Sequence, residues 1–136
     1  MQAQEVFIGV DVAKDTLVSC ICGVSKPQLV ANEEQAIKRW LKTLSPQAVI
    51  GMESTGRYHQ SLARLAHQAG LRVYVLNAKD VYFYAKALGA RGKTDPGDAQ
   101  VIARYIAEHH SMLHAWTPGT AAQIRVQELL QRRARV

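Results

Sequence analysis

The first part of the chain alternates between apolar and polar positions with a period of two, which predicts β-strands. In residues 6–12, valine and isoleucine side chains occupy one face, whereas Phe7, Gly9 and Asp11 occupy the other. Two further strands are expected, and short turn segments separate all three; the expected ranges are strands over 16–22 and 28–31 and turns over 13–15 and 23–27. Because the connections are short, we expect an antiparallel meander.

A helical period then replaces the alternation. The elements expected next are a helix over 32–44, a strand over 48–53, a helix over 57–69 and a strand over 72–76. Asn32 is expected to cap the first of these helices, with Gln35 in capping-box position, and Gly70 to end the second in a left-handed conformation. A strand–helix–strand unit of this length joins parallel strands, so the sequence predicts an α/β fold with a mixed sheet.

The last part of the chain also has helical spacing, interrupted by one small basic loop. The expected elements are a helix over about 80–88, a loop over 89–94, a helix opened by Asp95-Pro96 and running to about 109, an irregular stretch over 113–118 and a last helix from about 119. No internal repeat or low-complexity segment is present in the sequence.

The composition is that of one globular domain with a basic balance. The chain has 136 residues, 48% of them hydrophobic, and a formal net charge of +6. No apolar run approaches the roughly 20 residues of a membrane span, and the N-terminus lacks a signal-peptide layout, so we expect a cytoplasmic protein. The positive charge favours a polyanionic partner, either nucleic acid or a membrane surface. Cys20 and Cys22 share one face of a strand and are expected to pack as small hydrophobic residues.

Asp11 and Glu53 are carboxylates in segments that are otherwise apolar. Asp11 belongs to the first strand, and Glu53 ends the strand that contains Gly51. An ionised carboxylate removed from water must be paired, hydrogen-bonded or bound to a metal. Sites in α/β sheets gather at the carboxyl ends of parallel strands. The simpler alternatives are an ion pair between Asp11 and Lys14, and a Glu53 that faces solvent or caps the next helix.

Asp95 and Asp98 begin a predicted helix, where acids are favourable without any catalytic role. An Asp at the N-cap, a Pro at the first helical position and an acid in the first turn complement the free N–H groups and the dipole. Asp98, however, shares one helical stripe with Ile102, Tyr105 and Ile106. That spacing predicts that Asp98 faces the sheet rather than the solvent.

Considered together, these carboxylates predict a divalent-metal site for phosphodiester chemistry. Carboxylates within about 4 Å of one another repel by several kcal/mol at an effective dielectric near 20, so they coexist only when they are protonated or when cations lie between them. Oxygen ligands without His or Cys suit Mg²⁺ or Mn²⁺, and two such ions serve phosphodiester cleavage. The predicted catalytic and metal-binding residues are Asp11, Glu53, Asp95 and Asp98.

Four segments, in their order and spacing, resemble the DEDD transposases of bacterial insertion sequences, the group that includes the Piv-type DNA invertases and the bridge-RNA-guided recombinases. The segments are FIGVDVAKDT, VIGMESTGRYH, VYVLNAKDVYFYAKALGARGKTDPGDAQVIARYI and LHAWTP. Motifs such as GVDVAKD or TGRYH are weak alone, and the KTD-x-x-DA segment makes the combination specific. The resemblance covers residues from about 6 to 118.

The resemblance implies a RuvC-like, ribonuclease H-type fold, and it assigns the four acids to divalent metal and to DNA strand cleavage and transfer. It also implies DNA as the partner, a guide (bridge) RNA in some members, and a homo-oligomer, either a dimer or a tetramer. Family members continue into a coiled coil and a second domain with a nucleophilic serine. Residues 1–118 are therefore expected to form the catalytic domain and residues 119–136 to begin the linker, so that the chain alone would not complete recombination.

Four cations flank the acidic positions in the sequence: Lys14, Arg57, Arg91 and Lys93. They are predicted to bind nucleic-acid phosphates, with solvated surface charge as the alternative. The run Tyr82-Phe83-Tyr84 is expected to pack in the core, although such side chains also stack on bases. His59 and His109 are expected to be structural.

Two other functions remain open at this point. A Holliday-junction-resolvase-like nuclease would share the acids but need no serine domain, and a non-catalytic nucleic-acid-binding or assembly module would use the acids only for capping and pairing. Binding of Mg²⁺ or Mn²⁺ that depends on Asp11 would exclude the second. An actin-like kinase or ATPase is disfavoured, because Val12-Ala13-Lys14 follows Asp11 where that class has a Gly-Thr phosphate loop.

Overall fold

The computed structural model describes residues 4–91 and 98–119, which form a mixed five-stranded sheet of order β3-β2-β1-β4-β5. The strands are β1 (Val6–Val12), β2 (Thr16–Ile21), β3 (Gln28–Ala31), β4 (Ala48–Glu53) and β5 (Arg72–Leu76). Strands β1, β2 and β3 pair antiparallel, whereas β1, β4 and β5 pair parallel. The predicted α/β class, the meander and the βαβ unit are confirmed.

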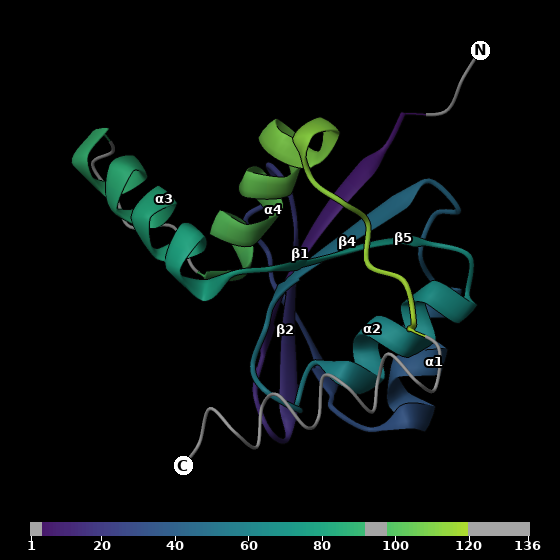
Figure 1. The fold of residues 1–136 in the computed structure, drawn as a ribbon. Coiled ribbons are helices and arrows are strands. Elements are labelled where there is room, and N and C mark those ends of the chain that lie inside the picture. The colour runs from purple at the N-terminus through teal and green to yellow at the C-terminus, as the bar shows by residue number, and fades with distance from the viewer. Residues whose placement is uncertain (1–3, 92–97, 120–136) are drawn as a thin grey trace.

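Helices cover both faces of the sheet (Figure 1). They are α1 (Glu34–Lys42), α2 (Gln60–Gln68), α3 (Ala78–Arg91), α4 (Asp98–His109) and the short 3₁₀ helix η1 (His110–Met112). Helices α1 and α2 lie together on one face, and α4, with α3 beside it, covers the other. Within the described ranges, no helix combines the length and apolarity needed to cross a bilayer.

The core under α1 and α2 follows from the alternation of the strands. Ile8 of β1, Ile50 of β4 and Val73 of β5 point to this face and pack against Trp40 and Leu62 of the two helices. Each fully buried aliphatic side chain of this kind contributes roughly 1.5–3 kcal/mol to folding. The opposite phase of the same strands, which carries Asp11 and Glu53, therefore faces α4.

Two glycines on neighbouring strands allow α4 to lie close to the sheet. Gly9 of β1 pairs with Gly51 of β4. A Cβ atom at Gly9 would overlap the carbonyl oxygen of Ala99 and the backbone nitrogen of Ala103, and one at Gly51 would lie 2.7 Å from the Cγ2 atom of Ile106. Glycine within a strand marks such an approach of another backbone. The approach fixes the position of the first turn of α4 and thus of Asp98.

The predicted cap of the first helix is wrong. Helix α1 begins at Glu34, and its N-cap residue Glu33 forms no side-chain capping bond. The Asn32 amide instead donates to the carbonyl oxygens of Ala13, at 2.8 Å, and Tyr58, at 3.0 Å. Asn32 therefore links the β1–β2 turn to the β4–α2 loop, and its place in a capping-like sequence does not reflect a cap.

Several predicted boundaries also shift. Helix α1 ends at Lys42, β2 ends at Ile21, and α2 begins at Gln60 after a turn over 56–59. Gly70 has the expected positive φ, of 86°. Helix α3 continues to Arg91, so the loop predicted from residue 89 is wrong at its start. Leu88 packs against the α4 side of the core, and this tertiary contact outweighs the weak helix propensity of the following glycine.

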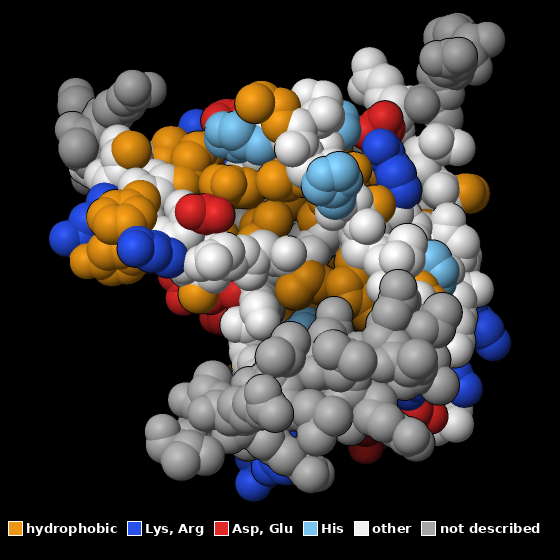
Figure 2. Space-filling model, in the orientation of Figure 1, with side chains coloured by type: hydrophobic (Ala, Val, Ile, Leu, Met, Phe, Trp, Pro, Cys, Tyr) orange, Lys and Arg blue, Asp and Glu red, His pale blue; other side chains and the backbone are white. Residues whose placement is uncertain are grey.

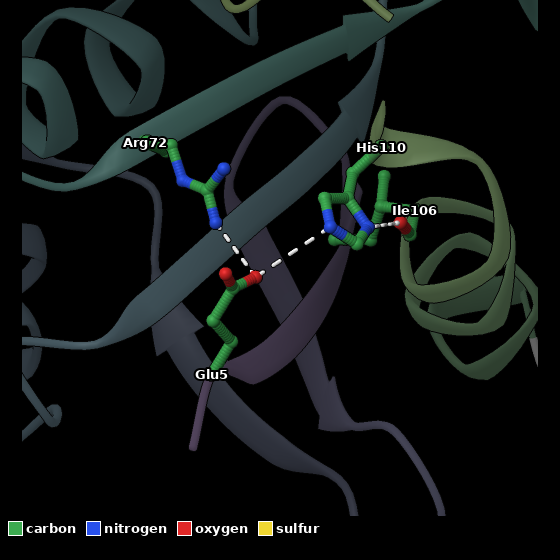
Figure 3. Close-up of polar contacts among 4 residues, drawn as sticks. All are labelled: Glu5, Arg72, Ile106 and His110. Atoms are coloured by element: carbon green, nitrogen blue, oxygen red, sulfur yellow. Dashed lines mark hydrogen bonds and ion pairs between the residues drawn. The ribbon is translucent and has the colours of Figure 1, made fainter. Parts of the chain in front are cut away.

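The amino ends of β1 and β5 are tied to the end of α4 by polar contacts (Figure 3). The Glu5 carboxylate lies 2.6 Å from the Arg72 guanidinium and 3.7 Å from Nε2 of His110. Nδ1 of His110 lies 3.0 Å from the carbonyl oxygen of Ile106. This network stands at the edge of the sheet opposite the carboxyl ends of the parallel strands.

Candidate functional site

Asp11 and Glu53 lie side by side at the carboxyl edge of the sheet. The β1–β4 ladder ends with the pair Val10 and Met52, and each acid follows immediately on its own strand. Adjacent strands are about 4.8 Å apart. Both acids share the face of Gly9 and Gly51, and Asp11 is exposed whereas Glu53 is half-buried. The two central parallel strands therefore present two neighbouring carboxylates toward the start of α4.

Asp98 brings a third carboxylate to the same place from α4. Burial raises the pKa of Asp11 above its ordinary value, and the nearby Asp98 carboxylate raises it further. Burial likewise raises the pKa of Glu53, followed by the effects of Asp98 and Asp11. Like charges disfavour one another's ionised forms in this way only at short range. Carboxylates from β1, β4 and α4 thus share one electrostatic environment.

Neither Asp11 nor Glu53 forms an ion pair in the described part of the chain, and no side chain caps α2. The ion pairs there join Arg64 to Glu34 and Glu5 to its two partners at the far edge, and none involves the three acids. Lys14 lies exposed in the β1–β2 turn without pairing to Asp11. The loop after Glu53 is closed by His59, whose Nδ1 accepts the backbone N–H of Thr55 at 3.1 Å.

The acids are grouped, but they do not form a ready-made metal site. No three His, Cys, Asp or Glu side chains within residues 4–91 and 98–119 converge closely enough to hold a metal ion. The fourth predicted acid, Asp95, lies outside the described residues. Any coordination by this group therefore needs side-chain movement, a further ligand, or both.

Asp11 and Asp98 line an open hollow of about 720 Å³ between β2, the β2–β3 turn and the start of α4. Its other lining residues are Val18, Cys20, Cys22, Gly23, Ser25, Pro27, Ala99, Gln100 and Arg104. Asp98 is exposed, so the prediction that it is turned away from solvent is wrong. Ile102 and Ile106 on the same stripe are buried, whereas Asp98 is the first residue of α4 and lies exposed at the end of the helix.

Gln100 is a structural determinant of the site that the sequence did not reveal. Its Oε1 accepts the backbone N–H of Gly23 at 3.1 Å, and its Nε2 donates to the carbonyl oxygens of Val24, at 2.8 Å, and Ile21, at 3.4 Å. These contacts join the β2–β3 turn to the first turn of α4, next to Asp98. A polar residue on a helix surface has no periodic signal that predicts such long-range bonds.

A comparison with protein families identifies the group to which this arrangement belongs. The model of the DEDD transposases of the IS110 type, described as "Transposase", matches residues 8–136. The chain belongs to this transposase family. Two curated relatives are each 32% identical over 137 residues: the pilin gene-inverting proteins of Moraxella bovis and Moraxella lacunata. The alignment covers 93% of this chain but spans only 41% of the length of each relative.

Solved structures show the same fold at low sequence identity. The structure titled Thermus thermophilus RuvC matches with a TM-score of 0.61 at 18% identity, covering 82% of this chain and 99% of that chain. T. thermophilus RuvC in complex with Holliday junction substrate matches with a TM-score of 0.59 at 18% identity, covering 82% of this chain and 98% of that one. The RuvC-like fold expected from the resemblance is confirmed.

The structure describes the side chains of two of the four cations that were predicted to bind nucleic acid in this transposase-family chain. Lys14 and Arg57 are both exposed and follow β1 and β4 at the carboxyl edge of the sheet. The Arg57 guanidinium lies 5.4 Å from the centre of the Tyr58 ring. The side chain of Arg91 and the whole of Lys93 lie outside the described residues.

The cysteines and histidines have mainly structural surroundings. Cys20 is buried and Cys22 half-buried, both are free thiols, and burial raises the pKa of Cys20, which keeps that thiol protonated. His59 is buried, and burial lowers its pKa, in agreement with its acceptor role in the loop after β4. Nδ1 of His109 lies 2.9 Å from the Tyr105 carbonyl oxygen on its own helix.

Proposed function

We propose that this chain carries the catalytic acids of a transposase and takes part in divalent-metal-dependent DNA strand cleavage and transfer during insertion-sequence transposition. The observation that carries the proposal is the meeting of Asp11, Glu53 and Asp98, from three different elements, at the carboxyl edge of the parallel strands. Asp95 is proposed as the fourth acid. Membership of the transposase family and the RuvC-like fold support this assignment.

The donor set fits Mg²⁺ or Mn²⁺ by its chemistry. All proposed ligands are carboxylate oxygens, the donors that these hard cations prefer. Burial and the neighbouring acids raise the pKa values of Asp11 and Glu53, and a divalent cation would favour their ionised forms. Asp11 and Asp98 are exposed, so their side chains are free to turn toward a common ion.

The chain itself supplies rigidity, position and charge. Asp11 and Glu53 are held by paired central strands, and α4 carries Asp98 toward them on its closely packed first turn. Lys14 and Arg57 are proposed to bind the phosphates of the substrate at the same edge. When bound, two divalent ions would activate the attacking oxygen and stabilise the leaving one.

The partners are also proposals. We expect DNA as the substrate, and the complex of RuvC with a Holliday junction supports this expectation by fold alone. We further propose that residues 1–118 are the catalytic domain and residues 119–136 the start of a linker. We expect that the full activity needs a serine-bearing domain, a homo-oligomer (dimer or tetramer) and, in the RNA-guided branch of the family, a bridge RNA.

Titration with Mn²⁺ tests the proposed function directly. The parent chain should show binding by calorimetry and a rise in Tm, about 2.7 kcal/mol of added stability at a hundredfold excess over Kd. Asp11→Asn and Glu53→Gln should each abolish most of the response, because each removes a proposed ligand. Asp15→Asn is the matched control, since this exposed acid lies in the same hairpin. An equal Mn²⁺ response in all variants would contradict the proposal.

A resolvase-like nuclease is the second candidate, and the likeness to RuvC favours it. The two functions differ in substrate structure. Metal-dependent cleavage of a four-way junction by this chain alone, with linear duplex left intact, would support the resolvase. A chain that binds DNA but no Mn²⁺ would support the non-catalytic module instead.

A further inference from the structure

Helix α3 has two different hydrophobic faces. One face carries Val81, Tyr84, Ala85 and Leu88, spaced i, i+3, i+4 and i+7, and it packs into the core beside α4. The other face has the same spacing and carries Lys79, Tyr82, Phe83 and Lys86. We call these last four residues the α3 outer face. Its aromatic residues are not needed for the core.

The aromatic side chains of the α3 outer face are open to solvent. Tyr82 is 54% exposed and Phe83 is 57% exposed, so the prediction that they pack in the core is wrong for both, although Tyr84 is half-buried there. Their rings meet edge to face with centroids 5.6 Å apart. Neighbouring exposed large aromatic side chains are a common feature of binding surfaces.

Positive charge accompanies the rings. Nζ of Lys86 lies 5.0 Å from the centre of the Tyr82 ring, and Lys79 is exposed one turn earlier. Figure 2 shows hydrophobic side chains flanked by Lys or Arg over α3, on the left of the molecule. Burial raises the pKa of Tyr105 on α4, and the nearby Asp80 carboxylate of α3 raises it further, so Asp80 lies on the side of α3 that is near α4.

The α3 outer face lies on a helix that starts beside the acids. Leu76, the last residue of β5, pairs with Glu53, and α3 begins two residues later. From there α3 projects away from the sheet (Figure 1). The base of α3 therefore lies next to Glu53.

We propose that the α3 outer face binds unpaired nucleotides of a DNA substrate whose adjoining part reaches the acids. Bases stack on exposed aromatic rings regardless of sequence, and Lys side chains bind the phosphates between them. A second copy of the chain fits less well, because a symmetric contact would bring the lysines of both copies together. The inference deepens the proposed function and rests on it for the choice of polymer.

The test compares a double variant, Tyr82→Ala with Phe83→Ala, with the parent chain in EDTA, where no cleavage occurs. Binding is measured by fluorescence anisotropy with labelled single-stranded DNA, single-stranded RNA and duplex DNA. The double variant should bind a single strand about tenfold more weakly than the parent, because base stacking is lost, and should bind the duplex nearly as well. Binding of single-stranded RNA but not of single-stranded DNA would overturn the choice of DNA. Tyr82→Trp with Phe83→Trp should restore binding, because tryptophan also stacks.

The matched control is Leu29→Ala, which removes a hydrophobic side chain that is 71% exposed on the edge strand β3. The proposal is overturned if the parent binds no single strand, if the double variant binds single strands as the parent does, if duplex binding falls equally, or if Leu29→Ala has the same effect. A dimer that the double variant converts to a monomer, measured by light scattering, would overturn it in favour of self-association.

The Mn²⁺ titration keeps this inference separate from the proposed function. A double variant that loses single-strand binding but retains the metal response supports the α3 outer face. A parent chain without a metal response would contradict the metal-dependent function, but it would not change the result for single-strand binding.

Discussion

At the residue scale, the site is defined by negative charge that the described part of the chain does not neutralise. Asp11, Glu53 and Asp98 lie together without an ion-paired cation in residues 4–91 and 98–119. Burial is the largest cause of the raised pKa values of Asp11 and Glu53, and the neighbouring acids add to it. Such an arrangement costs stability at neutral pH, so it is expected where binding of a cation repays the cost.

This charge cluster predicts a pH dependence of stability in EDTA. The pKa values of Asp11 and Glu53 are raised in the folded chain, so the folded state binds protons more tightly than the unfolded state does. The stability that these protons contribute is fully present below the ordinary carboxyl pKa of about 4 and is lost as the pH rises through the raised values. Asp11→Asn removes one charge and relieves Glu53. It should therefore raise Tm above the parent's near pH 7 and not below about pH 4. Parallel Tm curves for the two proteins would rule out the cluster.

At the element scale, α4 controls the site through its contact with the sheet and with the β2–β3 turn. The paired glycines of β1 and β4 let its backbone approach, and Gln100 fixes its first turn to residues 21–24. The position of Asp98 therefore depends on the packing of α4 against β1 and β4 and on the β2–β3 turn, which is far from Asp98 in the sequence. These contacts yield two predictions.

Gly9→Ala should destabilise the chain more than Gly51→Ala. The added methyl group at Gly9 meets the backbone of Ala99 and Ala103, which moves only with the whole helix, whereas at Gly51 it meets the Ile106 side chain, which is able to rotate. We expect a loss of about 3 kcal/mol for Gly9→Ala and about 1 kcal/mol for Gly51→Ala in urea unfolding. Gly9→Ala should also weaken Mn²⁺ binding, because α4 carries Asp98. Equal losses would show that α4 is not held at Gly9.

Gln100→Ala should loosen the β2–β3 turn. Its loss removes the acceptor of the Gly23 N–H group and a donor to the Val24 carbonyl, at a cost of about 1 kcal/mol because the site is exposed. Hydrogen exchange at the Gly23 amide should accelerate. Gln100→Glu retains an acceptor for the Gly23 N–H group but brings a carboxylate oxygen against the Val24 carbonyl oxygen, so exchange should accelerate in this variant too; unchanged exchange in Gln100→Ala would contradict the assigned geometry.

At the scale of the whole molecule, the two edges of the sheet have different roles. The carboxyl edge holds the acids, whereas the amino edge holds the network of Glu5, Arg72 and His110 (Figure 3). The sheet separates a core under α1 and α2 from a smaller one under α3 and α4. Changes at the amino edge should therefore affect stability without affecting the site.

Glu5→Gln tests this separation. It removes a partly exposed ion pair, which should cost at most about 1 kcal/mol and less at high salt. The Mn²⁺ response and the binding of single strands should match those of the parent. A changed metal affinity in this variant would show that the two edges are coupled, contrary to the expectation.

The sequence by itself determined the strands, the mixed sheet and the position of Glu53 at a strand end, because burial on one or both faces imposes periodicity on local residue choice. It also singled out Asp11, since a carboxylate in an apolar strand is conspicuous. The order and spacing of its motifs also indicated the family.

Only the tertiary structure decided where side chains with ambiguous patterns go. Asn32 bridges two loops rather than capping a helix, Asp98 is exposed although its stripe is buried, and Tyr82 and Phe83 are solvent-facing although they are aromatic. The bonds of Gln100 join residues more than seventy positions apart. Such outcomes depend on which surfaces meet in space, and local spacing along the chain carries no information about that.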